Sequence, residues 1–423
     1  MSVKRIRVRN FKSFRDLDVE LRPFNVLIGA NASGKTNFVR IFEFLRDITN
    51  HGLDNAISLQ GGVPYLRNLN LGASEDLCIE VKSDDEIGHE IGQGEEFIGL
   101  RCREISYEFS MKFKKGRSPF VISRDRLRQV LCAVQLAKKK NEIEERKVLT
   151  EDTVFVSRSN GGIELSTGSS DSEMKNILDE LFPPSVRDIG IDDPHSLLIQ
   201  SSIASFPFLP MVLFRTLLSR TAVYDFDPRV LKGAHPITGK AELEPDGSNL
   251  SIVLKNILGD KEKKRKMANL VGDLLPFVSD MGVEKFADKS LLFKLREKYF
   301  EKQYLPGSML SDGTLGIIVL IVALYFENKP LAIIEEPGRN IHPHLLSKVV
   351  EMMKDASSQK QIIVTTHNPE LVKHAGIENI LLVSRDEDGF TTVTHPSEKE
   401  EVRAFLQQDM SIDELYVASL LEI

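Results

Sequence analysis

The sequence predicts a discontinuous α/β fold, in which residues 1–83 and 300–397 form one domain around a large insertion. Each of these two segments alternates apolar strands with amphipathic helices, which is the pattern of an α/β sheet. Neither segment has enough strands for a stable sheet of its own. Residues 84–299 are therefore predicted to be an inserted domain of mixed, mainly helical structure, and residues 398–423 a helical tail.

The first segment opens with strands. Residues 3–28 predict strand, turn, strand and strand, and the last strand, "NVLIG", is apolar enough to be buried. A helix is expected over residues 35–48, because Phe38, Ile41 and Leu45 share one face.

The insertion shows several changes of pattern. Residues 84–115 turn acidic and then strand-like, and residues 125–148, which contain "AKKKNEIEERK", are expected to be helical. Residues 157–200 are rich in Ser, Gly, Asp and Pro, so loops should dominate there. Residues 242–300 are predicted to be mainly helical.

The last segment returns to strand–helix alternation. A polar turn precedes the apolar helix 315–326, and three apolar strands follow, each separated from the next by a helix. These strands are "LAIIEEP", "QIIVTTH" and "NILLVSR".

The composition limits the class of protein. A chain of 423 residues, 41% of them hydrophobic, can bury a large core. Its net charge of −7 argues against a general polyanion binder but is compatible with a local basic groove. Three scattered cysteines fit a reducing compartment with neither a disulfide framework nor a zinc site. The N-terminus lacks a signal-peptide core and the longest apolar run is about half of the ~20 residues a membrane span needs, so we expect a cytoplasmic protein with no membrane partner.

The stretch "GANASGKT" (29–36) matches the phosphate-binding loop G-x-x-x-x-G-K-[ST] at every specified position. It follows a predicted strand and begins a predicted helix, as the motif requires. Gly29 and Gly34 let backbone amides surround the phosphates, while Lys35 should reach the β- and γ-phosphates and Thr36 should offer its hydroxyl to Mg²⁺. ATP and Mg²⁺ are thus the predicted cofactors. The predicted nucleotide-binding residues of this segment are Gly29, Asn31, Gly34, Lys35, Thr36 and Asn37.

Polar side chains end two of the apolar strands. A strand buried on both faces carries charge only at its C-terminal tip, where ligands collect. At the tip of "LAIIEEP", Glu335 is expected to hold Mg²⁺, directly or through water, and Glu336 to polarise the attacking water. His367, at the tip of "IIVTTH", could bond the γ-phosphate or that water, although a lone histidine at a strand end is often only a satisfied polar group. His342 and His344 in "NIHPHLL" indicate a helix start rather than a metal pair.

The order phosphate loop, long insertion, "LSDGT", "IIEEP" and "TTH" resembles the ABC-type ATPase heads of the SMC and RecF group. The opening "IRVRNFKSFRDLDVELRPFNVLIGANASGKTN" is similar to the N-terminal lobe of that group. The stretches "LEPDGSNLSIVLKNIL", "IEEPGRNIHPHLL" and "TTHNPELV" are most similar to stand-alone bacterial AAA-family ATPases related to the overcoming-lysogenization-defect and Septu defence proteins. The resemblance implies a discontinuous ABC-type P-loop ATPase head with N- and C-terminal lobes, and it implies little about residues 84–240.

The resemblance also gives a role to "MLSDGTLG". In this group the signature turn docks on the γ-phosphate held by a second subunit, so Ser311 would offer its hydroxyl and Gly313 its amide to the ATP of a partner copy. An ATP-dependent homodimer, or a higher assembly, is implied. Ser311 can at the same time be the N-cap of the apolar helix. Asp312 and Thr314 depart from the glycine and glutamine that are common in the group, and a carboxylate near a γ-phosphate is unfavourable unless it points away.

Further assignments also rest on analogy with the group. Lys12 in "NFKSF" is expected to contact the adenine side of the nucleotide, and Gln60 is a candidate for the Q-loop glutamine. Gly338 stands where relatives often carry an acidic residue, which leaves the subunit contact after Glu336 open. Two basic clusters, 138–140 and 261–266, could line a nucleic-acid backbone, but solvated helix faces explain them more simply.

The leading hypothesis is an ATPase that dimerises around ATP and regulates a DNA-directed process, in anti-phage defence with a separately encoded nuclease or toxin as effector. DNA is a possible partner. A structural or DNA-repair clamp of the SMC type and a transporter ATPase are the alternatives, although the sequence has neither long coiled coils nor a recognisable coupling segment. A nuclease within the same chain would need a catalytic domain after the head, for which we expect no room.

Overall fold

The structure is a computed structural model, and the chain in it forms two compact units. The first unit comprises Met1–Leu21, Thr36–Arg220 and Arg385–Val393, and the second comprises Arg22–Lys35, Thr221–Ser384 and Thr394–Ile423. The predicted boundaries of head, insertion and tail stay a prediction, because two compact units do not say which segments fold independently. The described residues are 1–84, 86–91, 96–114, 119–139, 142–159, 162–168, 172–181, 193–200, 209–286, 289–300, 302–407, 410–418 and 420.

The first unit is built on an antiparallel sheet with the order β2-β1-β4-β6-β7-β8-β9, and β5 pairs with β6. Along β1 and β4, buried residues alternate with more exposed ones, so one face of the sheet is buried and the other is more open to solvent. The strands are β1 (Arg5–Phe11), β2 (Phe14–Glu20), β4 (Leu77–Ser83), β5 (Ile87–Ile91), β6 (Glu96–Phe113), β7 (Phe120–Lys139), β8 (Glu142–Ser159) and β9 (Gly162–Thr167).

Helix α1 contributes aromatic side chains to the core of the first unit. The ring of Phe44 lies 5.8 Å from that of Phe11 and 6.4 Å from that of Phe109, so helix and sheet are joined by aromatic contacts. The helices here are α1 (Lys35–His51), α2 (Leu53–Leu59), α3 (Val63–Leu66), α4 (Ser172–Leu181) and α6 (Leu209–Ser219).

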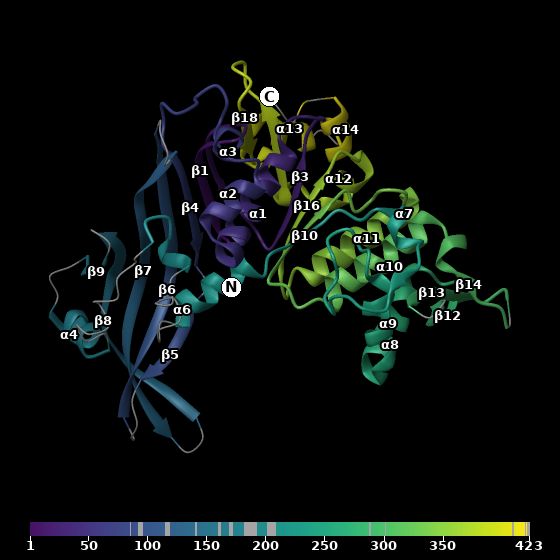
Figure 1. Cartoon of the computed structure of the whole chain (residues 1–423), viewed down its shortest axis with the longest axis horizontal. Helices are drawn as coiled ribbons and strands as arrows, with labels where there is room; N and C mark the ends of the chain where they lie inside the picture. Colours follow the sequence, from purple (N-terminus) through teal and green to yellow (C-terminus); the bar gives the residue numbers. More distant parts are fainter. Residues whose placement is uncertain are drawn as a thin grey trace. The chain divides into compact units, whose positions relative to one another are not determined.

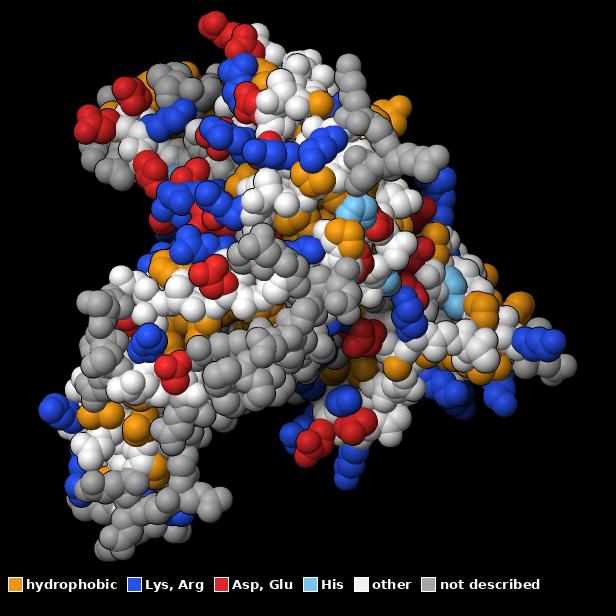
Figure 2. Space-filling view, turned by 60° about the vertical axis from the view of Figure 1, so that its left-hand side comes forward, with side chains coloured by type: hydrophobic (Ala, Val, Ile, Leu, Met, Phe, Trp, Pro, Cys, Tyr) orange, Lys and Arg blue, Asp and Glu red, His pale blue; other side chains and the backbone are white. Residues whose placement is uncertain are grey.

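The exposed face of this sheet carries paired charges of both signs. Arg5 and Arg7 both bond Asp18, and Lys82 lies 2.6 Å from Glu104, which also pairs with Arg128. Figure 2 shows acidic and basic side chains interspersed on the side of the molecule that it displays. Such a surface is not the single-sign basic surface that binds polyanions without sequence preference.

The second unit contains the parallel sheet that the sequence predicts. Its strands run in the order β10-β15-β16-β3-β17, and every neighbouring pair is parallel. Strands β3 and β16 can be followed side by side in Figure 1. The strands are β3 (Phe24–Ile28), β10 (Ala222–Tyr224), β15 (Leu331–Glu335), β16 (Gln361–Thr366) and β17 (Ile380–Arg385), and the short β18 (Thr391–Thr394) comes next in the chain.

Helix α10 (Asp312–Tyr325) is buried within the second unit. Its residues from Leu315 to Leu324 are apolar apart from Gly316, and they belong to the same core as the parallel sheet and α8, α9, α11 and α12. A helix that is apolar all round must be buried in this way. The other helices are α7 (Pro228–Leu231), α8 (Leu250–Gly259), α9 (Lys261–Leu274), α11 (Pro343–Ala356), α12 (Pro369–Ala375), α13 (Glu400–Gln407) and α14 (Ile412–Val417).

The structure confirms the α/β fold and the predicted strands and helices of both terminal segments, but it corrects two expectations for the insertion. Residues 125–139 and 142–148 are strand, within β7 and β8, and not helix. Their charges pair across strands, as when Arg128 of β7 pairs with Glu104 of the neighbouring strand β6.

The second correction concerns residues 242–300. They are helical only as far as Leu274, because β12 (Val278–Phe286) and β13 (Ser290–Glu297) form a hairpin, to which β11 (His235–Pro236) and β14 (Leu305–Pro306) add. The insertion is thus mixed, as predicted, but its first half is mainly β structure. Residues 157–200 contain β9 and α4, and much of the expected loop lies outside the described residues. In the described part of the chain, no helix combines the length and the hydrophobicity needed to span a bilayer.

Candidate functional site

The phosphate loop connects β3 to α1, as the sequence predicts. Gly29 has a φ of +155°, and a Cβ atom at this position would lie 2.1 Å from the carbonyl oxygen of Val383 in β17. Only glycine permits this close approach, so the loop starts tight against the sheet. Asn31 and Thr36 are exposed, which leaves the amide of the first and the hydroxyl of the second accessible to a ligand.

Lys35 lies over the loop that precedes it. Its Nζ donates hydrogen bonds to the carbonyl oxygens of Gly29 (2.7 Å) and Ala30 (3.0 Å). Burial lowers the pKa of Lys35 below its ordinary value, while the negative charges of Glu336 and Glu335 raise it in part. A half-buried ammonium group held by neutral carbonyls is well suited to exchange them for phosphate oxygens.

The predicted catalytic residues Glu336 and His367 are in direct contact. The Nδ1 atom of His367 lies 2.6 Å from Oε1 of Glu336, and the hydroxyl of Thr366 donates to Oε2 at 3.1 Å. The Glu336 side chain is 19% exposed, whereas that of His367 is 60% exposed. The carboxylate is therefore fixed by two neighbours from the end of β16, and the histidine ring stays accessible.

Backbone strain is concentrated at the predicted site segments. Among the described residues, the non-glycine positions with positive φ are Asn10, Lys12, Ala32, Glu336 and Asn340. Each lies in "NFKSF", "GANASGKT" or "EPGRN", the stretches that the sequence analysis singled out. Non-glycine residues in this region of φ/ψ space cluster at binding and catalytic sites, because only strong packing keeps them there.

The donor set fits ATP and Mg²⁺. Loop amides, the Lys35 ammonium and the start of α1 are suited to phosphate. Thr36 and Glu335 offer the hard oxygen atoms that Mg²⁺ prefers, and this ion usually takes one or two carboxylates together with phosphate oxygens and water. Over the described ranges, no group of three or more His, Cys, Asp or Glu side chains is arranged to hold a metal. His342 caps α11 with Pro343 at the first helical position, as the helix-start interpretation predicts.

The signature turn precedes α10. Ser311 is the N-cap of this helix, and its Oγ accepts a hydrogen bond from the backbone N–H of Thr314 at 3.1 Å. A Cβ atom on Gly313 would lie 2.6 Å from the carbonyl oxygen of Asn340, so a side chain has no room there. The N-cap interpretation of Ser311 is confirmed, while its contact with a partner's phosphate stays a prediction.

Lys12 and Asn37 lie in one cavity of the first unit. The cavity has a volume of about 400 Å³ and is also lined by Ser13 and Tyr65. Asn37 donates to the hydroxyl of Ser13 at 2.7 Å, and burial lowers the pKa of Lys12. Lys12 Nζ lies 3.5 Å from the carbonyl oxygen of Gln60, whose side chain is buried. The structure therefore brings together two of the predicted nucleotide contacts in a space that a ligand can enter.

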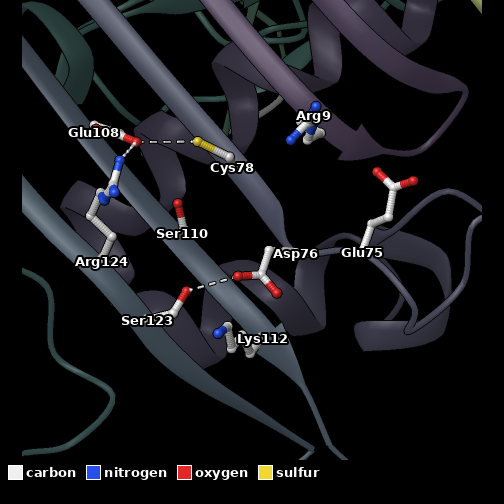
Figure 3. A pocket seen from close by; sticks show the side chains of 9 residues that line it. All are labelled: Arg9, Glu75, Asp76, Cys78, Glu108, Ser110, Lys112, Ser123 and Arg124. Atoms are coloured by element: carbon white, nitrogen blue, oxygen red, sulfur yellow. Dashed lines mark hydrogen bonds and ion pairs between the residues drawn. The ribbon is translucent and has the colours of Figure 1, made fainter.

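A larger hollow, of about 680 Å³, opens on the charged face of the sheet in the first unit (Figure 3). Among the residues that line it, Arg124 bonds Glu108 at 2.9 Å, and Ser123 donates to Asp76 at 3.2 Å. No motif in the sequence indicates this hollow. Its acidic and basic side chains are mixed, so it favours neither an anion nor a cation.

Two residues near the predicted site were missed by the sequence analysis. Thr366 holds Glu336, and its place in a polar strand tip was a signal that could have been used. Tyr416 of α14 donates to the carbonyl oxygen of Gly29 at 3.4 Å. No local pattern could have indicated this contact, because 387 residues separate its partners.

Family models match both halves of the chain. Residues 1–181 match "AAA ATPase domain", and residues 218–373 match "AAA domain, putative AbiEii toxin, Type IV TA system". Both models describe AAA domains, so each of these two segments is similar to AAA ATPases.

The chain is also similar to particular proteins. The chain is 24% identical over 408 residues to the OLD nuclease of Thermus scotoductus. This alignment covers 94% of this chain and 65% of the relative. It is 28% identical over 102 residues to the Septu protein PtuA of Bacillus thuringiensis, which covers 22% of this chain and 26% of that protein. The chain thus spans less than two thirds of the length of either relative. A solved SMC head bound to the C-winged helix domain of ScpA is 14% identical, with a TM-score of 0.47 over 93% of this chain and 98% of that one.

Proposed function

We propose that two copies of this chain close around ATP and Mg²⁺ in the cytoplasm, and that hydrolysis controls a DNA-directed process of anti-phage defence. The process would be carried out by a separately encoded nuclease or toxin. The observation that carries the catalytic part is the contact between Glu336 and His367 at the ends of two neighbouring strands, in the same unit as Lys35.

Each side chain has a distinct task in this proposal. Lys35 binds the β- and γ-phosphates, and Thr36 and Glu335 hold Mg²⁺, which supplies charge neutralisation at the phosphates. Glu336 orients a water molecule and takes its proton as the water attacks the γ-phosphorus, so that ADP and phosphate are formed. His367 and Thr366 keep the Glu336 carboxylate in one orientation through their hydrogen bonds.

The dimer is supported by the start of α10. Ser311 is exposed, and the side chain of Met309 just before it is 72% exposed although it is apolar. An exposed apolar side chain beside a helix N-terminus suits a surface that meets another protein and an anion. Ser311 and Gly313 would contact the γ-phosphate bound by the partner copy.

The role in defence is supported by the relatives. One is an OLD nuclease and another is the Septu protein PtuA, and part of the chain matches a model of an AbiEii-like AAA domain. We therefore place the chain as the ATP-dependent regulator, with DNA as the target of the process.

Glu336→Gln tests the proposal. The amide keeps the shape of the side chain but cannot take a proton, so ATP should bind normally while turnover falls by on the order of 100-fold or more. An ATP-bound dimer should accumulate and be visible by light scattering. Glu351→Gln is the matched control, because Glu351 is an exposed glutamate on α11 in the same unit. Normal turnover by the Glu336 variant would contradict the assignment of the base.

The effector is tested separately. Purified chain incubated with DNA, Mg²⁺ and ATP should leave the DNA intact, because cutting is assigned to a second polypeptide. Cutting that persists in a pure preparation, and that is lost with Glu336→Gln, would show that the chain is itself the nuclease.

A further inference from the structure

Asp312, the residue that departs from the usual glycine of the signature turn, is bound on two sides. Its Oδ1 atom lies 2.5 Å from Nζ of Lys232, and its Oδ2 atom lies 3.5 Å from the side-chain amide of Asn340. Lys232 is the C-cap of α7, and Asn340 lies in the turn that follows Glu336. The carboxylate is therefore held by two segments that are distant from it in the sequence.

The pair is partly shielded from solvent. The Lys232 side chain is 34% exposed and that of Asp312 is 40% exposed. At such sites charges interact more strongly than they do in open water. An unpaired Asp312 would occupy the N-terminus of α10 as an anion and repel any phosphate that approached Ser311 and Gly313. The ion pair cancels this charge and directs the carboxylate toward Lys232.

We propose that Lys232 is a positioning residue for the signature turn. It neutralises and orients Asp312, so that the turn can receive a phosphoryl group. The inference rests on the proposed function, in which that group is the γ-phosphate bound by the partner copy. Lys232 itself has no contact with the Ser311 hydroxyl in the described structure, so its action passes through Asp312.

A double-mutant cycle tests this role. Lys232→Met keeps the length of the apolar stem and removes the charge, so ATP-dependent dimer formation and kcat should both fall by roughly 10-fold, the size typical of coupled neighbours. ATP binding by the separate chain should change less than about 2-fold, because the phosphate loop is untouched. Lys232→Arg should restore most of the activity, since it restores the positive charge.

The decisive comparison uses Asp312→Gly. With glycine at this position no carboxylate needs to be neutralised, so adding Lys232→Met should change dimer formation by less than about 2-fold. A purely structural lysine would instead be needed equally in both backgrounds. Lys329→Met is the matched control, because Lys329 is also a partly buried lysine, paired with Glu242 at 2.5 Å.

The outcomes distinguish a failure of the proposed function from a failure of the role of Lys232. If the wild-type chain forms no dimer with ATP, the proposed function fails whatever Lys232 does. If the wild type dimerises and Lys232→Met has no effect, or has the same effect with Asp312 and with glycine, the role of Lys232 is overturned. If Lys232→Met does not fold, Lys232→Gln, which keeps a donor for Asp312, takes its place in the cycle under the same criteria.

Discussion

Replacing Gly313 by alanine should disrupt the signature turn more than its small size suggests. The added Cβ would lie 2.6 Å from the carbonyl oxygen of Asn340 and 3.5 Å from its carbonyl carbon. Ordinary van der Waals contact begins near 3.4 Å, so the two backbones must separate by several tenths of an ångström. Because both partners are backbone, no side-chain rotation can relieve the contact, and we expect a loss of about 1–3 kcal/mol in the free energy of unfolding.

Gly316, one turn further along α10, provides the matched control. Nothing lies within 4 Å of a Cβ atom built there. Alanine is favoured over glycine inside a helix by about 0.5–1 kcal/mol, so Gly316→Ala should be neutral or stabilising. The two variants therefore make the same chemical change in the same helix. Gly313→Ala should lower the free energy of unfolding, whereas Gly316→Ala should leave it unchanged or raise it.

Urea denaturation compares the stabilities, and light scattering with ATP measures dimer formation. Gly313→Ala should be the less stable variant by about 1–4 kcal/mol and should form less dimer, because its turn is displaced. Equal stability of the two variants, with normal dimer formation by Gly313→Ala, would refute the close contact between this turn and Asn340.

Two further predictions concern the subunit arrangement and pH. Lys35→Ala and Ser311→Arg should each abolish ATPase activity in a homodimer. Mixing the two variants should restore activity, because a mixed two-fold dimer retains one site with an intact loop and an intact signature turn. A covalently linked dimer that binds ATP at its intact site but does not hydrolyse it would contradict the trans role of Ser311. Burial raises the pKa of Asp125 from 3.8 to about 6, and its carboxyl group accepts hydrogen bonds from Tyr107 and from the Leu198 amide. The folded state therefore binds this proton more tightly than the unfolded state. The resulting contribution of Asp125 to the free energy of unfolding is fully present below about pH 4, and about 3 kcal/mol of it is lost as pH rises to about 6. Unfolding measured from pH 4 to 7 should show this loss for the wild type relative to Asp125→Asn, and parallel pH profiles would disprove it.

The phosphate loop could be located from sequence because its signals are local. A buried strand, a glycine pattern and a helix start follow one another within residues 24–51, and the structure has β3, the loop and α1 there. The strand tips that carry Glu336 and His367 were predictable for the same reason. These two side chains bond each other because β15 and β16 are parallel neighbours in the sheet. The predicted strand–helix alternation made this pairing of strands plausible.

The error over residues 125–148 also has a physical cause. A run of alternating charge can stabilise a helix through pairs four residues apart, or a strand through pairs with its neighbours. The local sequence alone does not indicate which of these partners the charged side chains have in the fold. In β7, Asp125, Leu127 and Gln129 are buried whereas the residues between them are not, and this period of two is the signal of a strand.

The turn after Glu336 shows most clearly what sequence reasoning could not provide. Glu336 and Asn340 both have positive φ, at +46° and +61°, and each such residue costs about 1–3 kcal/mol unless its surroundings enforce it. The contacts that enforce it come from elsewhere in the second unit: the backbone N–H of Glu336 donates to Thr365 at 2.9 Å, and the carbonyl of Asn340 packs against Gly313. The segment that orients the predicted base is therefore packed directly against the turn predicted to meet a partner's phosphate. Since close-packed backbone cannot yield on one side alone, a shift of the signature turn must be accommodated at Asn340, four residues from Glu336.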